Sequence, residues 1–207
     1  MGSRPPPDVE RAPGQVHQEP AWKVNLVQGD TLIALTGRLT WVPGQNPAPW
    51  LLLALALALV AAALGVFGYW EWPLAVLVAV LTINDLYHAV AIAWTFGGGF
   101  WTKSAKFFSG SFYSIIGWVL GLLAAWLLIR RRVDGLYAAV FAGISAALFT
   151  GLLDITVLSR SQAPFDGLIG VDQLTVAVSL GLGVGIATAA FVALRRVPLE
   201  TDASDDE

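Results

Sequence analysis

Cysteine is absent from this chain of 207 residues, and methionine occurs only at position 1. Without cysteine, the chain can form no disulfide and no thiolate site for zinc or an iron–sulfur cluster. The same scarcity argues against a copper or silver carrier built on soft thiolate and thioether ligands. Histidine is scarce as well, so imidazole chemistry has only two candidate positions, His17 and His88.

Charged residues are also few. They make up 13% of the chain, whereas a typical soluble domain has about 25%. The 12 basic and 15 acidic residues nearly balance, which argues against nucleic acid as a partner, because nucleic acid requires a basic face. Hydrophobic residues make up 56% of the chain. This composition predicts an integral membrane protein whose surroundings are the lipid bilayer.

Five long apolar segments follow one another in the second part of the chain. The hydrocarbon core of a bilayer is about 30 Å thick, and a helix needs about 20 apolar residues to cross it. The segments that we expect to do so are residues 50–69, 73–96, 112–129, 136–158 and 174–194. The predicted fold is an all-α integral membrane protein of five transmembrane helices, spanning residues 50–195, with a short β-leaning N-terminal extracytoplasmic segment.

The segments outside the helices differ in character. Residues 1–21 are rich in proline, glycine and charge, which predicts a disordered arm in which His17 is solvated. Residues 22–49 combine a β-leaning stretch, with a hairpin turn expected at Gly29 and Asp30, and a proline-rich collar. Residues 97–110 are expected to form a loop, and residues 196–207 an acidic cytoplasmic tail.

The β-leaning stretch is too small to be stable alone. Two strands are predicted before residue 37, and residues 38–42 are expected to add a third. An isolated sheet of this size is marginal in water. We therefore expect residues 22–49 to dock on the helices or on another membrane or extracytoplasmic protein.

Clusters of arginine predict the orientation. Arg130–Arg132 follow the third segment and Arg195–Arg196 follow the fifth. Cytoplasmic loops of membrane proteins carry an excess of basic residues. The prediction is a multi-pass protein of the plasma membrane with the N-terminus outside and the C-terminus in the cytoplasm, although Lys103 and Lys106 then fall on the outer side.

Small residues recur at a spacing of four in the last three segments. The third contains Gly117 and Gly121, and the fifth contains Gly181 and Gly185. Such GxxxG faces allow two helices to approach closely. Packing within the chain is one interpretation, and a homo-oligomer through the same faces is the other.

Three ionisable residues lie inside the apolar segments and form the candidate site. Asp85 and His88 are three residues apart in the second segment, so they share one helix face, and Asp154 lies in the fourth. A charged side chain near the bilayer centre costs about 2.5–3.5 kcal/mol on insertion scales. We therefore expect Asp85, His88 and Asp154 to share one polar cavity.

Three interpretations of this cluster remain open. It can bind a divalent metal such as zinc, copper(II), iron or manganese, since carboxylate and imidazole are suitable ligands. It can handle protons or ions, since histidine titrates near neutral pH. It can also be a hydrogen-bonded clasp between helices. No cofactor is assured by the sequence.

No enzyme motif accompanies the cluster. The glycines of Gly97–Phe100 lack the lysine pattern of a nucleotide-binding loop, and Ser159 and Ser161 have no neighbouring histidine–acid pair. The leading prediction is a non-enzymatic membrane protein, either an accessory subunit or a small transporter-like module. The alternative is a membrane metal-site protein that uses the same three residues.

Two stretches carry a resemblance to a known group of proteins. GRLTWVPGQNPAPW (residues 37–50) and GLLDITVLSRSQAPF (residues 151–165) resemble segments of uncharacterised multi-pass membrane proteins of high-GC Gram-positive bacteria. In that family an extracellular β domain precedes a W-V-P-G-x-x-P-x-P-W collar and a helical bundle. The resemblance implies an outside N-terminus and a missing or shortened extracellular domain, and it implies no activity.

Overall fold

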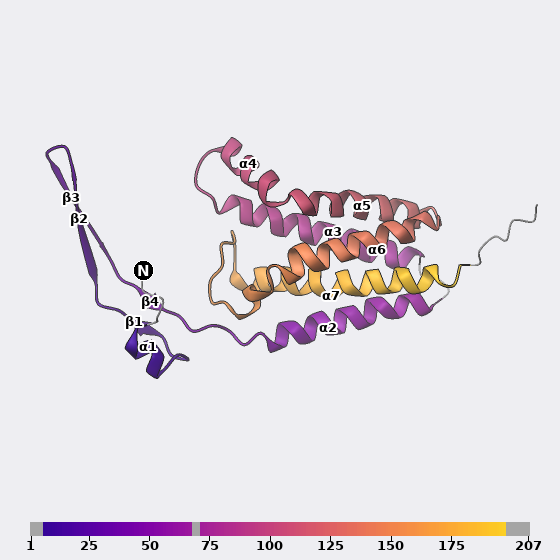
Figure 1. The fold of residues 1–207 in the computed structure, drawn as a ribbon, viewed down its shortest axis with the longest axis horizontal. Helices are drawn as coiled ribbons and strands as arrows, with labels where there is room; N and C mark the ends of the chain where they lie inside the picture. Colours follow the sequence, from indigo (N-terminus) through magenta and orange to yellow (C-terminus); the bar gives the residue numbers. More distant parts are fainter. Residues whose placement is uncertain (1–5, 68–70, 198–207) are drawn as a thin grey trace, which may run out of the picture. The chain divides into compact units, whose positions relative to one another are not determined.

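The computed structural model describes residues 6–67 and 71–197 and divides the chain into two compact units (Figure 1). The N-terminal unit contains residues up to Gln45 together with Ser159–Ser161. The helical unit contains Asn46–Leu158 and the chain from Gln162 onward. The predicted end of the first helix at residue 69 and the acidic tail from residue 198 lie outside the described residues.

The N-terminal unit contains the predicted hairpin. Strand β2 (Trp22–Gln28) pairs antiparallel with β3 (Thr31–Gly37), so that Gly29 and Asp30 form the two-residue turn. Gly29 has a φ of 59°, a conformation that tight hairpin turns require and that glycine adopts without strain. Every residue of β2 is exposed, and so is every residue of β3 except Gly37. The hairpin therefore buries little apolar surface within its own unit.

The prediction of disorder for residues 1–21 is wrong for the part that the structure describes. Residues 6–21 contain a short helix, α1 (Pro7–Arg11), and a strand, β1 (His17–Gln18). Proline at the first turn suits a helix start because its missing N–H would be unpaired there. His17 is half-buried, with its Nε2 2.7 Å from the carbonyl oxygen of Ala12.

The predicted third strand is present with a different partner. Strand β4 (Thr40–Trp41) pairs antiparallel with β1, with His17 opposite Trp41, instead of extending the hairpin. The polar composition of residues 1–21 contained no signal for this pairing, because the two strands lie more than 20 residues apart in the sequence and are two residues long.

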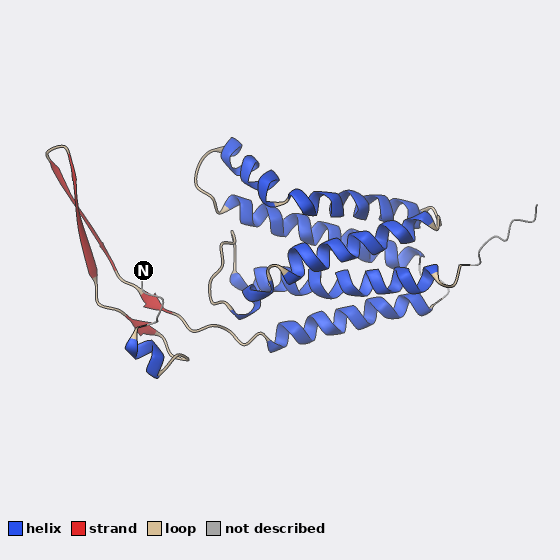
Figure 2. Cartoon of the chain, viewed as in Figure 1, coloured by secondary structure: helices blue, strands red, loops and turns tan. Residues whose placement is uncertain are grey.

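The helical unit contains all the long helices (Figure 2). Its regular elements are α2 (Ala48–Ala63), the 3-10 turn η1 (Leu64–Val66), α3 (Glu71–Trp94), α4 (Phe100–Gly110), α5 (Phe112–Ile129), α6 (Asp134–Ala146), the π-helix η2 (Ala147–Leu152) and α7 (Ile169–Leu194). A further 3-10 turn, η3 (Ile155–Ser159), follows η2. Within residues 6–67 and 71–197, five helices are long and apolar enough to cross a membrane, as predicted.

Helix α7 is the central helix of this unit. It packs against α2, α3 and α6, and α5 lies against α3 and α6 (Figure 1). In their most apolar windows, 61% of the residues of α7 are buried and only 17% of those of α2. The main core contains large apolar side chains from four helices: Leu74, Leu128, Leu136 and Ile186. The polar residues of α7 are therefore surrounded by other helices.

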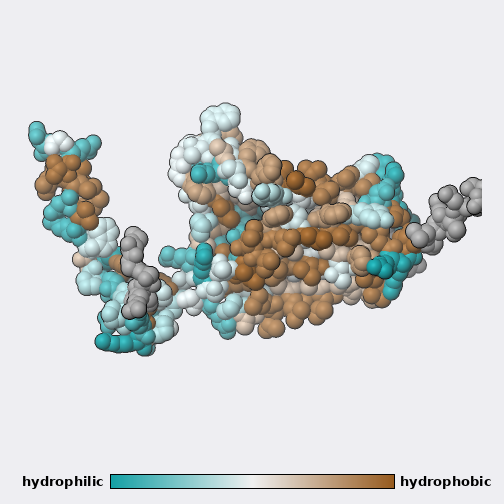
Figure 3. All heavy atoms as spheres, in the orientation of Figure 1, coloured by the Kyte–Doolittle hydropathy of each residue, from teal (hydrophilic) through white to brown (hydrophobic). Residues whose placement is uncertain are grey.

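The helices alternate in direction, so the bundle has two distinct ends. The arginine end contains Arg130–Arg132 and Arg195–Arg196, and here the Arg196 guanidinium donates to the carbonyl oxygen of Val66. The α4 end contains α4, the end of α3 and the beginnings of α5 and α7 (Figure 1). On the face drawn in Figure 3, the surface of the helical unit between these ends is mostly hydrophobic, and hydrophilic residues gather at the ends.

Three predicted boundaries are wrong, and all three concern the α4 end. The fourth segment was expected to run from 136 to 158, but its long helix ends at Leu152, so Asp154 follows it. The fifth was expected to begin at residue 174, but α7 begins at Ile169. Its first turns contain buried polar residues, and an apolar pattern does not include them. Residues 97–110 were expected to be a loop, and most of them form the amphipathic helix α4.

The small-residue faces lie inside the bundle. A Cβ at Gly143 of α6 would lie 2.6 Å from the carbonyl oxygen of Gly183 on α7. A Cβ at Gly185 would lie 2.6 Å from the Ala61 Cβ on α2, and one at Gly117 would collide with Ser145 on α6. Packing within the chain is therefore the use that the structure makes of these glycines. The homo-oligomer stays a prediction.

Candidate functional site: a buried histidine between carboxylates

Helix α3 turns its polar residues toward α7. Asn84, Asp85 and His88 lie within little more than one turn, and Asp85 and His88 are 4% and 3% exposed. This stretch stays helical because residues 74–94 contain no proline or glycine to interrupt the helix. A polar group removed from water must find partners inside the protein.

His88 finds acidic partners on both sides of its ring. Its Nε2 lies 3.2 Å from Oδ2 of Asp154, and its Nδ1 lies 3.2 Å from Oδ1 of Asp172. The Nδ1 also lies 2.9 Å from the hydroxyl oxygen of Thr175. Phe165, from the loop before α7, covers the imidazole with ring centroids 6.1 Å apart. The two carboxylates differ in access, since the Asp154 side chain is 38% exposed and that of Asp172 is 2% exposed.

The hydrogen bonds around Thr175 identify the proton on Nδ1. The Thr175 hydroxyl donates to the backbone oxygen of Asp172 at 2.8 Å, so its oxygen is left to accept from His88. The Nδ1 atom therefore carries a hydrogen. At Nε2, either an imidazolium donates to an ionised Asp154 or a protonated Asp154 donates to a neutral ring. The pair thus has two protonation states that use the same geometry.

Asp85 belongs to the same network through α7. Ser179 donates a short hydrogen bond to Oδ1 of Asp85. The Asn84 amide donates to the Ser179 hydroxyl at 2.9 Å and to the backbone oxygen of Thr175 at 3.0 Å. The predicted trio is thus brought together in two steps. His88 contacts Asp154 directly, whereas Asp85 is linked to them through Ser179, Asn84 and Thr175.

The structure adds site residues that the sequence interpretation missed. Asp172, Thr175 and Ser179 are spaced by three and four residues, so they form one face of α7 toward α3. Asp172 was overlooked because the fifth segment was expected to begin at residue 174. The spacing of these three polar residues was the available signal, and extending the segment by one turn would have included it. Asp172 also lies in the first turn of α7, where a negative charge is favourable.

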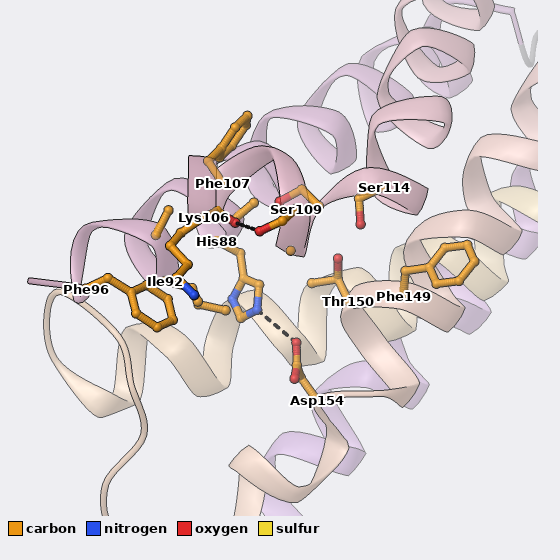
Figure 4. Close-up of a pocket in the computed structure, with 14 residues that line it drawn as sticks. His88, Ile92, Phe96, Lys106, Phe107, Ser109, Ser114, Phe149, Thr150 and Asp154 are labelled. Carbon is orange, nitrogen blue, oxygen red and sulfur yellow. Dashed lines mark hydrogen bonds and ion pairs between the residues drawn. The ribbon is translucent and has the colours of Figure 1, made fainter. Parts of the chain in front are cut away.

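The irregular end of the fourth segment determines where Asp154 lies. Helix α6 continues as the π-helix η2, and such wide turns occur often at functional sites. A Cβ at Gly151 would lie 2.8 Å from the Cα of Leu180, so the glycine allows η2 to approach α7 closely. Asp154 follows directly and turns toward His88 (Figure 4).

His88 and Asp154 form part of the wall of a cavity of about 210 Å³ (Figure 4). Its other walls come from the end of α3, from α4, from the start of α5 and from η2. Its polar lining residues are His88, Lys106, Ser109, Ser111, Ser114, Thr150 and Asp154, and its large apolar ones are Ile92, Phe96, Phe107 and Phe149. The cavity therefore lies at the α4 end and presents both an acid and a base.

The three residues predicted as metal ligands do not converge on one point. Among residues 6–67 and 71–197, no group of three or more His, Asp or Glu side chains is arranged to hold a metal ion. Both ring nitrogens of His88 already face oxygen atoms, and Asp85 faces Ser179. The arrangement is suited to proton exchange between His88 and its carboxylates.

Comparison with known proteins gave no relative: no protein-family model, no curated protein and no solved structure matches this chain. The resemblance to membrane proteins of high-GC Gram-positive bacteria therefore stays an expectation. What the site does has to be argued from its own geometry.

Proposed function

We propose that this protein is a non-enzymatic multi-pass protein of the plasma membrane whose His88–Asp154–Asp172 cluster takes up and releases protons. It acts as a small transporter-like module or as an accessory subunit. The N-terminus lies outside and the C-terminus in the cytoplasm. The observation that carries the proposal is the position of His88, with one ring nitrogen on a cavity-facing carboxylate and the other on a buried carboxylate.

The cost of burying these groups supports a function beyond packing. Ionisable residues within membrane-spanning segments are expensive and mark proton or ion pathways in many proteins. Three carboxylates and one imidazole are more than a clasp between helices requires, since Asn84 and Ser179 alone link α3 to α7. One proton moving between His88 and Asp154 changes the charge of both groups without breaking their contact.

Access to the cluster supports exchange with one side only. The cavity opens at the α4 end, where the Asp154 side chain is 38% exposed. The arginine end is closed by apolar side chains such as Leu74, Leu128 and Leu136, each 0% exposed. With arginines in the cytoplasm, the α4 end faces outside. The cluster then exchanges protons with the outer side and provides no continuous path across the membrane.

Nitrogen-15 NMR of the protein in nanodiscs tests the proposal. The variant His17→Ala leaves His88 as the only histidine, so its two ring nitrogens give unambiguous signals. We expect the ring signals of His88 to report a change of protonation state over the pH range in which the protein stays folded. In Asp154→Asn this titration should change, because the ring loses its acidic partner at Nε2.

The matched control is Asp134→Asn, which removes an exposed carboxylate paired with Arg132. Asp134 lies at the arginine end, and the cluster lies toward the α4 end. The His88 titration of this variant should equal that of the parent protein. Ring signals that stay constant over this pH range would leave the cluster as a structural clasp and would overturn the proposal.

The metal interpretation has weaker support. It requires Asp85, His88 and Asp154 to share an ion, whereas Asp85 is bonded to Ser179. Metal analysis of the purified protein, with His88→Ala as its control, is expected to give the same low metal content for both. A stoichiometric metal that disappears in His88→Ala would favour the metal function instead.

A further inference from the structure

The cavity beside the cluster presents two opposite charges. Lys106 of α4 lines one wall, and Asp154 lines another together with His88 (Figure 4). The Lys106 Nζ lies 5.3 Å from the centre of the Phe96 ring, a cation–π distance, and Phe96 also lines the cavity. The two charged groups therefore approach the same space from different elements.

The charge of His88 is balanced behind the cavity wall. When the ring is an imidazolium, Asp172 lies 3.2 Å from its Nδ1 and is itself 2% exposed. That buried pair has no net charge. The charges left to face the cavity are then one positive, on Lys106, and one negative, on Asp154. A simple anion or a simple cation would satisfy only one of the two.

We propose that this cavity binds a small zwitterion, a molecule that joins an ammonium group to an anionic group through a short linker. The ammonium lies against Asp154, and the anionic group lies against Lys106. The cavity has a volume of about 210 Å³. That space suits a compact molecule of the size of phosphoethanolamine.

The remaining lining residues fit such a ligand. Ser109, Ser111, Ser114 and Thr150 supply hydroxyl groups that can donate to an anionic oxygen or accept from an ammonium. Ile92, Phe96, Phe107 and Phe149 supply apolar walls for the linker. Ligand sites typically combine mainly apolar walls with a few convergent polar groups.

The inference deepens the proposed function, on which it rests, by naming the ligand class of the same site. An ammonium that contacts Asp154 competes with His88 for that carboxylate. Binding and protonation of the cluster are then linked, and each must change the affinity for the other by the same factor.

Three soluble probes test the ligand class on the full-length protein in phosphatidylglycerol nanodiscs. They are O-phosphoethanolamine, inorganic phosphate and ethanolamine, each titrated by isothermal calorimetry. We expect phosphoethanolamine to bind at least about tenfold more tightly than either fragment, because only the zwitterion satisfies both charges. Equal affinities for the three probes, or no binding of any of them, would overturn the inference.

Variants locate the binding. Lys106→Gln and Asp154→Asn should each weaken phosphoethanolamine binding at least about tenfold, since each removes one charged contact. The control is Lys103→Gln, which removes the neighbouring lysine of α4, whose Nζ lies over Trp94 and which does not line the cavity. Lys106 is exposed on α4, so its variant should fold and carries the test even if Asp154→Asn does not. Unchanged binding in Lys106→Gln would contradict the inference.

The lipid composition of the nanodiscs distinguishes two sources of the zwitterionic ligand, a lipid headgroup and a free molecule. If the natural ligand is a lipid headgroup, adding phosphatidylethanolamine to the nanodiscs should abolish binding of the soluble probe. If it is a free zwitterion, the probe should bind unchanged. Either result supports the shared chemistry. The His88 titration is recorded without any probe, so the proposed function and the ligand class can fail separately.

Discussion

At the scale of single residues, His88 is the central residue of the candidate site. It contacts Asp154 and Asp172, which belong to different parts of the chain. Removing either carboxylate leaves one ring nitrogen without its acidic partner. Removing both leaves the Thr175 hydroxyl as the hydrogen-bonding partner of the ring.

A double-mutant cycle should therefore detect coupling between the two carboxylates. We expect Asp154→Asn and Asp172→Asn to be non-additive by about 0.5–3 kcal/mol in the free energy of unfolding, because both act through His88. Thermal or denaturant unfolding in detergent provides the measurement. Asp154→Asn combined with Asp134→Asn is the control pair and should be additive. Additive effects for Asp154 and Asp172 would mean that His88 does not couple them.

The sequence predicted part of this site. The free-energy cost of placing an ionisable residue in an apolar segment identifies candidate residues, but it does not show which of them touch one another. Asp85, His88 and Asp154 stood out as ionisable residues in apolar segments, and the structure joins them in one network. Asp172 did not stand out, since it lies where a helix end and a loop look alike in composition. Which carboxylate contacts His88 depends on the π-helix before Asp154, and that geometry leaves no periodic pattern in the sequence.

At the scale of elements, close packing between α6 and α7 holds the two sides of the site together. Gly143 of α6 and Gly183 of α7 lie against each other, so neither position has room for a side chain. Both lie nearer the arginine end than the cluster does, and the contact brings η2 alongside α7.

A methyl group at this contact should loosen the bundle. Gly143→Ala is expected to destabilise the protein by about 1–3 kcal/mol, because its Cβ would lie 2.6 Å from the carbonyl oxygen of Gly183. Gly170→Ala is the matched control, since a Cβ there has nothing within 4 Å. The midpoint of thermal unfolding in detergent should fall for the first variant only. Equal midpoints would show that the helices do not approach as closely as described.

Helix α4 should lie in the membrane interface. Three of its aromatic side chains are exposed, Phe100, Trp101 and Phe108, by 65%, 83% and 61%. Lys106 and Ser109 line the cavity instead. Exposed aromatic residues on an amphipathic helix are typical of a helix embedded at headgroup level. The sequence interpretation missed α4 because three glycines precede it and its length is too short for a span.

Cysteine scanning checks this position of α4, because the native chain has no cysteine. Trp101→Cys and Phe108→Cys in proteoliposomes should react with a lipid-soluble maleimide and be protected from a water-soluble one. Gly14→Cys in the N-terminal unit should react freely with the water-soluble reagent. Equal aqueous reactivity at all three positions would place α4 in water.

At the scale of the whole molecule, the prediction of orientation rests on the number of long helices and on the two arginine clusters. Five long apolar helices and both clusters at one end were predictable, since apolar length and stop sequences are properties of composition. The pairing of β1 with β4 and the course of residues 97–110 were not, since they depend on contacts between distant or short segments.

The orientation is testable in intact cells. Gly14→Cys should be labelled by a membrane-impermeant reagent, and Ala203→Cys should be labelled only after the cells are permeabilised. The physical reason is the retention of basic loops in the cytoplasm. The opposite pattern of labelling would reverse the orientation and put the cavity on the cytoplasmic side.

The central claim is that the cluster exchanges protons with the outer side alone. The most direct test uses the His17→Ala protein, labelled with nitrogen-15 histidine, in proteoliposomes sorted by an affinity tag at the N-terminus so that this end is external. The external pH is changed while the internal pH is held fixed, and solid-state NMR reports the ring of His88. The account predicts that the His88 signals follow the external pH and ignore a change of internal pH. Signals that follow the internal pH, or that respond to neither, would contradict it.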